Sequence, residues 1–361
     1  MVTQKDIAIK VGVSVNTVSC ALRDSPRISR RVRQAVLKTA KEMGYTPNAA
    51  ARALRIKKSK VLGVIVTDIS NPVFGTMVKG IEKAASERDY SIIICNTDED
   101  YVMEENAVTT MISKRVDGVI ITPTQTETGT LDTLKRAQLP FVLMGRSFDN
   151  YPADNVVSDD FKGGMLAGEY LLKNGHKDII YINGPEHISS SKKRAEGITA
   201  ALRTENLCLK AVYSIMPDIK EGYSLMKEII SSSVDFSAIF CFDDYTAFGV
   251  IRAIREKGLR MPEDISVIGY DNTEFAEMYD NGLTSIDFNE YEIGVCAAEL
   301  LMDILDKKDN KDISDADFAA PRNVILEPSL VIRGSVYNNS SSISDRYQTG
   351  TGDFEKLPPH K

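Results

Sequence analysis

The sequence predicts an all-α headpiece of three short helices, followed by an α/β body in which two lobes each hold a doubly wound parallel sheet. Residues 3–44 place apolar side chains at helical spacing between capping residues and glycines, which is typical of short packed helices. Beyond Val61, short β-branched runs alternate with amphipathic helical stretches, which is typical of parallel strands joined by helical crossovers. The charge of the chain changes at the same place.

Three helices account for the headpiece. The first begins at Thr3, whose hydroxyl can cap it, and is interrupted by Gly-Val-Ser at residues 12–14. Ser14 caps a second helix, and a third runs from about residue 29 to residue 43, with Gly44 as its left-handed stop. Helices this short must pack against one another, because in isolation they are only marginally stable.

Seven short apolar runs account for the strands of the body. A single sheet with so many strands would be large, and ligand-binding bodies of this size often divide into two lobes with helices on both faces. Two such lobes leave a cleft between the C-terminal ends of their strands. The runs are, in order, VLGVIV, SIIIC, DGVII, PFVLM, DIIYI, SAIFC and DISVIG.

These patterns divide the chain into four parts. Residues 1–45 form a helix-turn-helix headpiece, and residues 61–337 form the two-lobed body, whose cleft is expected to bind a small effector. Residues 46–60, TPNAAARALRIKKSK, are Ala-rich and basic, and we expect a hinge that becomes helical when it is held against another surface. Residues 338–361 hold few apolar side chains and many Ser, Asn and Gly, which predicts a disordered tail.

The headpiece is basic and the body is acidic. Residues 1–60 carry 14 Lys and Arg against 3 Asp and Glu, a local charge of +11, whereas the remaining residues carry 30 against 48, a charge of -18. We therefore expect the headpiece to contact a polyanion such as nucleic acid, from which the body is repelled.

Cysteine usage and hydropathy exclude several other classes of protein. The five cysteines are scattered, without a Cys-x-x-Cys pair or a His at ligand spacing, so neither a metal site nor a disulfide framework is expected. A reducing cytoplasm fits best, and no cofactor is indicated. The chain has no signal-peptide pattern and no apolar run near the ~20 residues that span a bilayer, so we expect no membrane partner.

The second predicted helix has the composition of a DNA-reading helix. In a helix-turn-helix this helix lies in the major groove, and its first residues reach the base edges. Asn16 offers an amide suited to adenine, Val15 offers an apolar contact for a thymine methyl, and Thr17 and Ser19 offer hydroxyls for bases or phosphates. The alternative is a structural three-helix cap with a solvated arginine face, which the local charge of +11 disfavours. Backbone contacts are expected from the neighbouring arginines, Arg23, Arg27, Arg30, Arg31 and Arg33.

Polar residues that suit a small ligand follow several predicted strands. In the second lobe Asp243 follows SAIFCF and Asp271 follows SVIGY, and open α/β sheets bind ligands at these C-terminal strand ends. Aspartates there also cap helices, and we assign that role to Asp244, whereas Asp243 or Asp271 alone could be either. Arg194 lies near the start of the helix after DIIYINGP and could instead be a surface residue beside two lysines.

The first lobe offers three more candidates. Asn71 and Phe74 follow VLGVIVTDIS, and Arg146 follows PFVLM. A small polar ligand, such as a sugar, needs planar groups for bidentate hydrogen bonds and an apolar or aromatic face for its ring, and these residues supply both. The alternative for Phe74 is an ordinary core position.

An enzyme is not expected. The chain has no G-x-S-x-G, no P-loop and no G-x-G-x-x-G that opens a helix after a strand, and GGMLAG at residues 163–168 has the wrong spacing. The acidic runs at residues 98–100 and 159–160 are most simply helix caps and solvated surface. His176 in KNGHKD is typical of a structural turn.

The headpiece run DIAIKVGVSVNTVSCALRDSPRISRRVRQAVLKTAKEMGYTPNAAARALR resembles that of the lactose/galactose repressor (LacI/GalR) family of bacterial transcriptional regulators, and the resemblance continues to about Val336. It implies a periplasmic-binding-protein-like body and a homodimer whose two headpieces bind a pseudo-palindromic DNA operator. Leu54, seven residues after Pro47, stands where the family places a leucine that wedges into a base step of the minor groove, although an ordinary hinge contact is the alternative. The DNA-contacting residues implied are Thr3, Val15, Asn16, Thr17, Ser19, Cys20, Arg27, Asn48, Arg52 and Leu54.

Cys20 departs from the family pattern, which usually has Arg at this position. Loss of that Arg removes a guanine-reading side chain worth ~1–3 kcal/mol of discrimination. The operator is therefore expected to differ from the common family site at one symmetric base pair.

In the cleft, the resemblance joins the candidates into one site. Arg194 in KRAEG, Asp243 in CFDDYTAFG and Asp271 in IGYDNTE match the family's effector-contacting Arg and two acidic or amide positions, and SNPVFG matches the first-lobe wall less specifically. Pro217 stands near where family members often carry an aromatic residue, which disfavours an effector that needs a stacking surface there.

The resemblance thus implies a transcriptional repressor whose operator affinity is controlled by a small effector, a sugar or sugar derivative. A changed lobe arrangement would change the spacing of the hinges and couple the two affinities by ~1–3 kcal/mol. Release of DNA by the effector and tightening by it both remain open. The alternative is a stand-alone cytoplasmic sugar-binding protein, which the body alone would fit; its exported counterparts carry a signal peptide where this chain has a basic helix-turn-helix.

Overall fold

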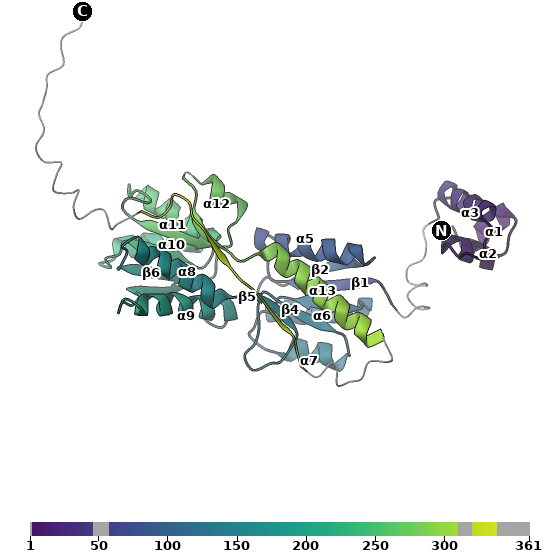
Figure 1. Ribbon diagram of the computed structural model, residues 1–361, viewed down its shortest axis with the longest axis horizontal. Helices are drawn as coiled ribbons and strands as arrows, with labels where there is room; N and C mark the ends of the chain where they lie inside the picture. The colour runs from purple at the N-terminus through teal and green to yellow at the C-terminus, as the bar shows by residue number, and fades with distance from the viewer. Residues whose placement is uncertain (1, 46–57, 280, 310–319, 338–361) are drawn as a thin grey trace, which may run out of the picture. The chain divides into compact units, whose positions relative to one another are not determined.

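The computed structural model describes residues 2–45, 58–279, 281–309 and 320–337 (Figure 1). The chain divides into two compact units, Met1–Ser59 and Lys60–Lys361. Most of the predicted hinge and the predicted tail therefore lie outside the described residues.

The first unit is the three-helix headpiece that the capping pattern predicts. Thr3, Ser14 and Ser29 each accept a hydrogen bond from a backbone N–H in the first turn of the helix that follows, which satisfies donors that the helix itself cannot pair. Gly12 adopts a φ of +76°, a left-handed conformation that favours glycine and ends the first helix. The helices are α1 (Gln4–Val11), α2 (Val15–Leu22) and α3 (Arg30–Glu42).

One apolar side chain from each helix fixes the centre of the headpiece. Ile7, Val18 and Val36 are fully buried and pack in one cluster. Burial of a side chain of this size contributes about 1.5–3 kcal/mol, so three short helices stabilise one another where each alone would not persist.

The second unit holds two six-stranded sheets, one in each lobe. In the first lobe all neighbouring strands pair in parallel, as predicted. The strands in spatial order are β11 (Asn323–Leu326), β5 (Asn155–Ser158), β4 (Phe141–Met144), β3 (Gly118–Ile121), β1 (Val61–Val66) and β2 (Ser91–Asn96).

The sheet of the second lobe is parallel except at one edge, where β12 runs antiparallel to β10. This edge strand is the departure from the predicted all-parallel sheet. The strands in spatial order are β12 (Ser329–Val331), β10 (Thr284–Asp287), β9 (Ser266–Tyr270), β8 (Ala238–Cys241), β6 (Ile179–Asn183) and β7 (Ala211–Ser214).

Helices cover both faces of each sheet, because successive strand side chains point to opposite faces. In β6, Ile179 and Tyr181 pack with α8 and α9, whereas Ile180 and Ile182 pack with α10 and α11. In the first lobe the two faces are covered by α5 and α13 and by α6 and α7 (Figure 1). The helices of the body are α5 (Pro72–Glu87), α6 (Tyr101–Lys114), α7 (Gly129–Arg136), α8 (Asp160–Lys173), α9 (Ser189–Arg203), α10 (Ile219–Ser231), α11 (Asp244–Glu256), α12 (Glu274–Met278) and α13 (Glu290–Asp309).

Three described segments cross between the lobes: from β5 into α8, from β10 into α13, and from β11 to β12 (Figure 1). The crossings set the C-terminal strand ends of the two sheets against the same cleft. None of the described helices combines the length and apolar character that a membrane span needs.

Sequence patterning missed five strands: β5, β7, β10, β11 and β12. Strands β7 and β11 alternate between half-buried and exposed residues, so they present no continuous apolar run. Strand β10 buries the polar residues Thr284 and Ser285. Burial is tolerated because the Thr284 N–H donates to the Ser335 hydroxyl and the Ser285 hydroxyl donates to Asp244. Tertiary hydrogen bonds of this kind leave no signal in hydropathy.

Candidate functional site

The N-terminal end of α2 presents the first two predicted DNA-reading residues to solvent. Val15 is 45% exposed although it is apolar, and Asn16 beside it is exposed. The headpiece core is complete without Val15, since Ile7 and Val18 fill it. An apolar side chain left in water next to an amide suits contact with base edges.

The next turn of α2 is partly engaged within the headpiece. The Thr17 hydroxyl lies 2.8 Å from the Ser14 hydroxyl, and Arg23 folds back so that its Nε donates to the Ser19 carbonyl at 2.9 Å. Arg23 Nη2 also lies 3.8 Å from Cys20 Sγ. The guanidinium of Arg23 therefore stands beside the position where the sequence lacks the expected Arg.

The remaining headpiece candidates differ in whether their side chains are held by contacts within the headpiece. The Thr3 hydroxyl is held in a reciprocal cap with Asp6, whereas Arg27 is exposed. Arg33, a predicted phosphate contact, forms an ion pair with Asp24 at 2.5 Å and donates to the Ser25 carbonyl, which holds the loop before α3. Asn48, Arg52 and Leu54 lie outside the described residues.

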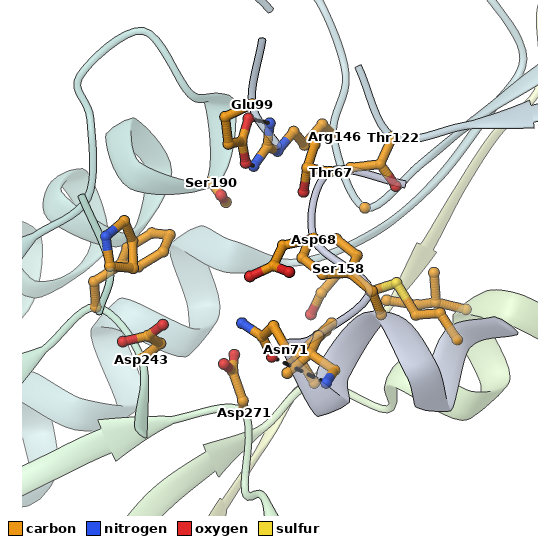
Figure 2. Close-up of a pocket in the computed structure, with 18 of the residues that line it drawn as sticks. Thr67, Asp68, Asn71, Glu99, Thr122, Arg146, Ser158, Ser190, Asp243 and Asp271 are labelled. Atoms are coloured by element: carbon orange, nitrogen blue, oxygen red, sulfur yellow. Dashed lines mark hydrogen bonds and ion pairs between the residues drawn. The ribbon is translucent and has the colours of Figure 1, made fainter. Parts of the chain in front are cut away.

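In the second unit a cavity of about 370 Å³ lies between the lobes, and all six predicted effector residues line it. Asn71, Asp243 and Asp271 stand around one space in Figure 2, with Arg146 at its far side. The six are Asn71, Phe74, Arg146, Arg194, Asp243 and Asp271.

Arg194 is buried, not a surface residue, and it is the most constrained group of the cavity. Its Nε donates to Asp160 Oδ1 at 2.8 Å, and its Nη1 donates to the Phe242 carbonyl at 2.6 Å. Its guanidinium carbon lies 3.4 Å from the centroid of the Tyr270 ring, a cation–π contact. Burial acts to lower the pKa of Arg194, but Asp160, Tyr270 and Asp271 together outweigh it, so the pKa is raised and the guanidinium stays charged.

Close approach of two helices fixes that geometry. A Cβ at Gly164 on α8 would lie 2.2 Å from the Arg194 carbonyl on α9, and one at Gly197 would lie 2.0 Å from the Phe161 carbonyl. The glycines of GGMLAG, which do not suit a phosphate loop, thus serve to pack α8 against α9 and to bring Asp160 within reach of Arg194.

The cap of α11 is Asp243 and not Asp244, to which the sequence analysis assigned that role. Asp243 caps α11, accepting from the Thr246 N–H at 2.8 Å, and also lines the cavity. Asp244 points away into the core, where it accepts from Ser285 and from Thr273. Burial raises the pKa of Asp243, and it raises the pKa of Asp244 to about 7.

Asp271 lies at the end of β9 in a strained backbone conformation, with a φ of +100°. Its backbone N–H donates to the Ile286 carbonyl at 2.8 Å, which holds the turn. Its side chain is 6% exposed and receives no hydrogen bond from the residues that the structure describes. Burial raises the pKa of this carboxyl well above its ordinary value, while Arg194 acts in the opposite direction.

In the first lobe Arg146 is held by Glu99. Its Nη1 donates to Glu99 Oε2 at 2.9 Å, its Nη2 lies 2.5 Å from Glu99 Oε1, and Nη1 also donates to the Pro123 carbonyl. Asn71 caps α5 by accepting from the Val73 N–H at 3.1 Å, and its amide group faces the cavity (Figure 2).

The assignment of the acidic runs to caps and surface is only half right. Asp100 and Asp159 do cap α6 and α8. Glu99, however, lines the cavity, and Asp160 is buried against Arg194. In each run, one carboxylate caps the helix that follows, and the adjacent carboxylate points towards the cavity or the core.

Sequence reasoning also missed several cavity residues. Asp68 follows β1 as Asp243 follows β8, so the strand-end rule could have found it. Thr67 and Thr122 are buried in the wall, and no hydrogen-bond partner for either hydroxyl occurs among the described residues. Pro217 lines the cavity, as the missing aromatic residue implies, but aromatic surface is supplied elsewhere by Phe74, Phe242 and Phe288.

The cavity can therefore hold a ring that offers hydrogen-bond donors. Carboxylates accept, the spare N–H groups of Arg194 and Asn71 donate, and aromatic side chains cover an apolar face. No cluster of metal-ligating side chains occurs among the described residues.

Two family models match the two units. Residues 3–48 match the bacterial regulatory proteins of the lacI family, and residues 59–326 match the periplasmic binding proteins and sugar binding domain of the LacI family.

Whole relatives and solved structures resemble the chain along nearly its full length. The HTH-type transcriptional repressor PurR of Pasteurella multocida (strain Pm70) is 35% identical over 93% of this chain and 99% of its own. The structure of the lac repressor dimer bound to operator and the anti-inducer ONPF has a TM-score of 0.82 at 25% identity, over 93% of this chain and 99% of that one. A LacI family regulator from Enterococcus faecium with bound ribose has a TM-score of 0.67 at 29% identity, over 77% and 99%.

Proposed function

Because this chain belongs to the LacI family of bacterial regulatory proteins, we propose that it is a transcriptional repressor that binds operator DNA with its headpiece and a small effector between its lobes. The observation that carries the proposal is the cavity: residues from both lobes, six of them singled out by sequence, surround one space. A ligand that touches both lobes favours the lobe arrangement that it fits, and so shifts the equilibrium between arrangements.

The headpiece reads DNA with α2 in the major groove. Val15 and Asn16 are exposed at the start of that helix, where base edges come within reach. Arg27 contributes charge for phosphates, and the hinge residues reach the minor groove. The proposed DNA-contacting set is Thr3, Val15, Asn16, Thr17, Ser19, Cys20, Arg27, Asn48, Arg52 and Leu54.

The proposed domain organisation follows from these roles. Residues 1–45 bind DNA, residues 46–60 form the hinge, residues 61–337 bind the effector and dimerise, and residues 338–361 form a tail. The lac repressor structure, described as a dimer bound to operator, supports a homodimer on a pseudo-palindromic site.

The effector is proposed to be a carbohydrate or a derivative of one. Structural neighbours hold ribose or cellobiose, and the matching family model includes a sugar binding domain. Arg194 and Asn71 donate to the ligand, Asp243 and Asp271 accept from it, and Phe74 covers its ring, with Arg146 completing the wall in the first lobe.

The chain is a regulator and not an enzyme, as its relatives are repressors. The proposed location is the cytoplasm, where operator DNA lies, and the five free cysteines fit a reducing compartment. A body of this fold would also suit a stand-alone sugar-binding protein. Sequence-specific DNA binding distinguishes a repressor from that alternative.

Selection of duplexes from a random DNA library with the full-length protein tests the proposal. We expect enrichment of one pseudo-palindromic sequence, and its loss in Asn16→Ala. The matched control is Asn150→Ala, at an exposed turn of the body, which leaves the enriched sequence unchanged. Binding without sequence preference in the wild type would contradict a repressor and favour the stand-alone protein.

A further inference from the structure

The cavity holds more negative than positive side chains. Six acidic residues and two arginines line it. Both arginines are already neutralised, Arg146 by Glu99 and Arg194 by Asp160. The four other carboxylates, Asp68, Asp98, Asp243 and Asp271, have no ion-pair partner in the part of the chain that the structure describes.

These four carboxylates are not equally free. Asp68 accepts from the backbone N–H and the hydroxyl of Ser70, at 2.8 and 2.6 Å, and Asp98 accepts from Asn96. One carboxylate oxygen of Asp243 accepts a hydrogen bond from the Thr246 N–H. Asp271 has no side-chain hydrogen bond among the described residues, although it is more than nine-tenths buried and faces the cavity (Figure 2).

The Asp271 carboxyl has little contact with solvent and no partner among the described residues, so it gains from a ligand that supplies a donor or a positive charge in place of water. A sugar hydroxyl or an ammonium group satisfies this side chain. A phosphate or carboxylate group brings further negative charge into a space where both arginines of the described lining are already paired.

Resting on the proposed function, we propose that the cavity selects a neutral or amine-bearing sugar and excludes sugar phosphates and sugar acids. Asp243 and Asp271 accept hydrogen bonds from donors on one edge of the ring, while Phe74 and Phe288 cover its apolar face. The charge class of the effector is thus set by the four unpaired carboxylates.

Matched sets of ligands test this inference on the full-length protein. Each set holds a neutral sugar, its amino derivative, its phosphate ester and its carboxylic acid, built on glucose, ribose and cellobiose. Thermal shift at roughly 10 mM of each probe ranks them, since a ligand that binds only the folded state raises its melting temperature. Isothermal titration calorimetry then measures the affinities of the ligands that bind.

We expect a neutral or amino member to bind, and the phosphate and acid of the same sugar to bind at least about tenfold more weakly, a difference of about 1.4 kcal/mol. Asp271→Asn and Asp243→Asn should narrow that ratio, because each replaces a carboxyl group that can ionise by an amide that cannot, while asparagine keeps an acceptor oxygen. Asparagine also tolerates positive φ and caps helices, so both variants should fold. Asp303→Asn, at a half-buried position outside the cavity where the side chain pairs with Arg88, should leave the ratio unchanged.

The inference is overturned if a phosphate or acid binds as tightly as its neutral parent, if the Asn variants leave the ratio unchanged, or if no neutral or amino sugar binds. Sequence-specific DNA binding is measured on the same preparation. Where that binding persists, the failure concerns the charge class alone, and where it is absent, the proposed function itself has failed.

Discussion

Arg194 Nε and Asp160 Oδ1 lie 2.8 Å apart, and both side chains are more than nine-tenths buried beneath the cavity between the lobes. The pair joins α9 to the first residue of α8, and the Tyr270 hydroxyl donates to the same carboxylate oxygen at 3.2 Å. One buried carboxylate therefore orients the main cationic donor of the cavity.

Asp160→Asn should destabilise the protein and weaken effector binding together. The substitution leaves the Arg194 charge buried without a counter-charge, a change that typically costs ~3–5 kcal/mol. Urea denaturation and sugar titration measure the two effects. Asp159→Asn is the matched control, because Asp159 caps α8 and Asn is an equally good cap, so its free energy of unfolding should stay within about 0.5 kcal/mol of the wild type. Equal effects of the two variants would contradict the role of the buried pair.

Gly164→Ala should separate α8 from α9. Its added Cβ would lie 2.2 Å from the backbone carbonyl of Arg194, which cannot move like a flexible side chain. We expect a loss of ~1–3 kcal/mol in the free energy of unfolding, with weaker sugar binding as Arg194 is displaced. Gly75→Ala in α5 meets no atom within 4 Å and should instead stabilise the helix by up to ~1 kcal/mol. A harmless Gly164→Ala would show that the helices do not need this close contact.

Asp244 should make stability fall as pH rises. Burial raises its pKa to about 7 in the folded protein, against an ordinary value of 3.8, so the folded state holds a proton that the unfolded state has released. This contribution is complete below the ordinary pKa and is lost as the pH rises towards the folded value. Asp244→Asn keeps the shape and removes the titration. Its free energy of unfolding relative to the wild type should therefore increase between about pH 4 and about pH 7 and level off above that. A constant difference across that interval, by urea denaturation, would contradict the assignment.

Cys20→Arg should change operator preference at one symmetric base pair. An Arg there can donate to guanine with two hydrogen bonds, worth ~1–3 kcal/mol of discrimination. Arg23 lies 3.8 Å from the Cys20 sulfur, so the new guanidinium must share this face of α2 with an existing one. Binding profiles over a randomised half-site library measure the change, and identical profiles for variant and wild type would refute it.

The sequence predicts those parts of the molecule whose causes are local. The starts of the headpiece helices could be predicted from their capping residues, Thr3, Ser14 and Ser29, because a cap acts within one turn of the helix. The apolar strands predict the two lobes. The rule that ligands bind at C-terminal strand ends predicts the positions of Asp243 and Asp271, which line one cavity with Arg194.

The parts that could not be predicted depend on neighbours distant in the chain. Asp243 and Asp244 are adjacent and chemically identical, and only Ser285 and Thr273, which approach from elsewhere, decide that Asp244 points inward. Asp160 is likewise buried because it pairs with Arg194, which lies elsewhere in the chain. Strand β10 is stabilised by hydrogen bonds of polar side chains, and the low hydropathy of those side chains argues against a buried strand.

The central claim is that DNA and effector binding are coupled in one repressor. The most direct test is the fluorescence anisotropy of the selected operator, titrated with full-length protein at increasing salt, with and without a sugar that binds the cavity. We expect a steep linear fall of log affinity with log salt, and a change in operator affinity of about 5–150-fold, in either direction, when the sugar is present. An operator affinity that stays the same with the cavity saturated would contradict it.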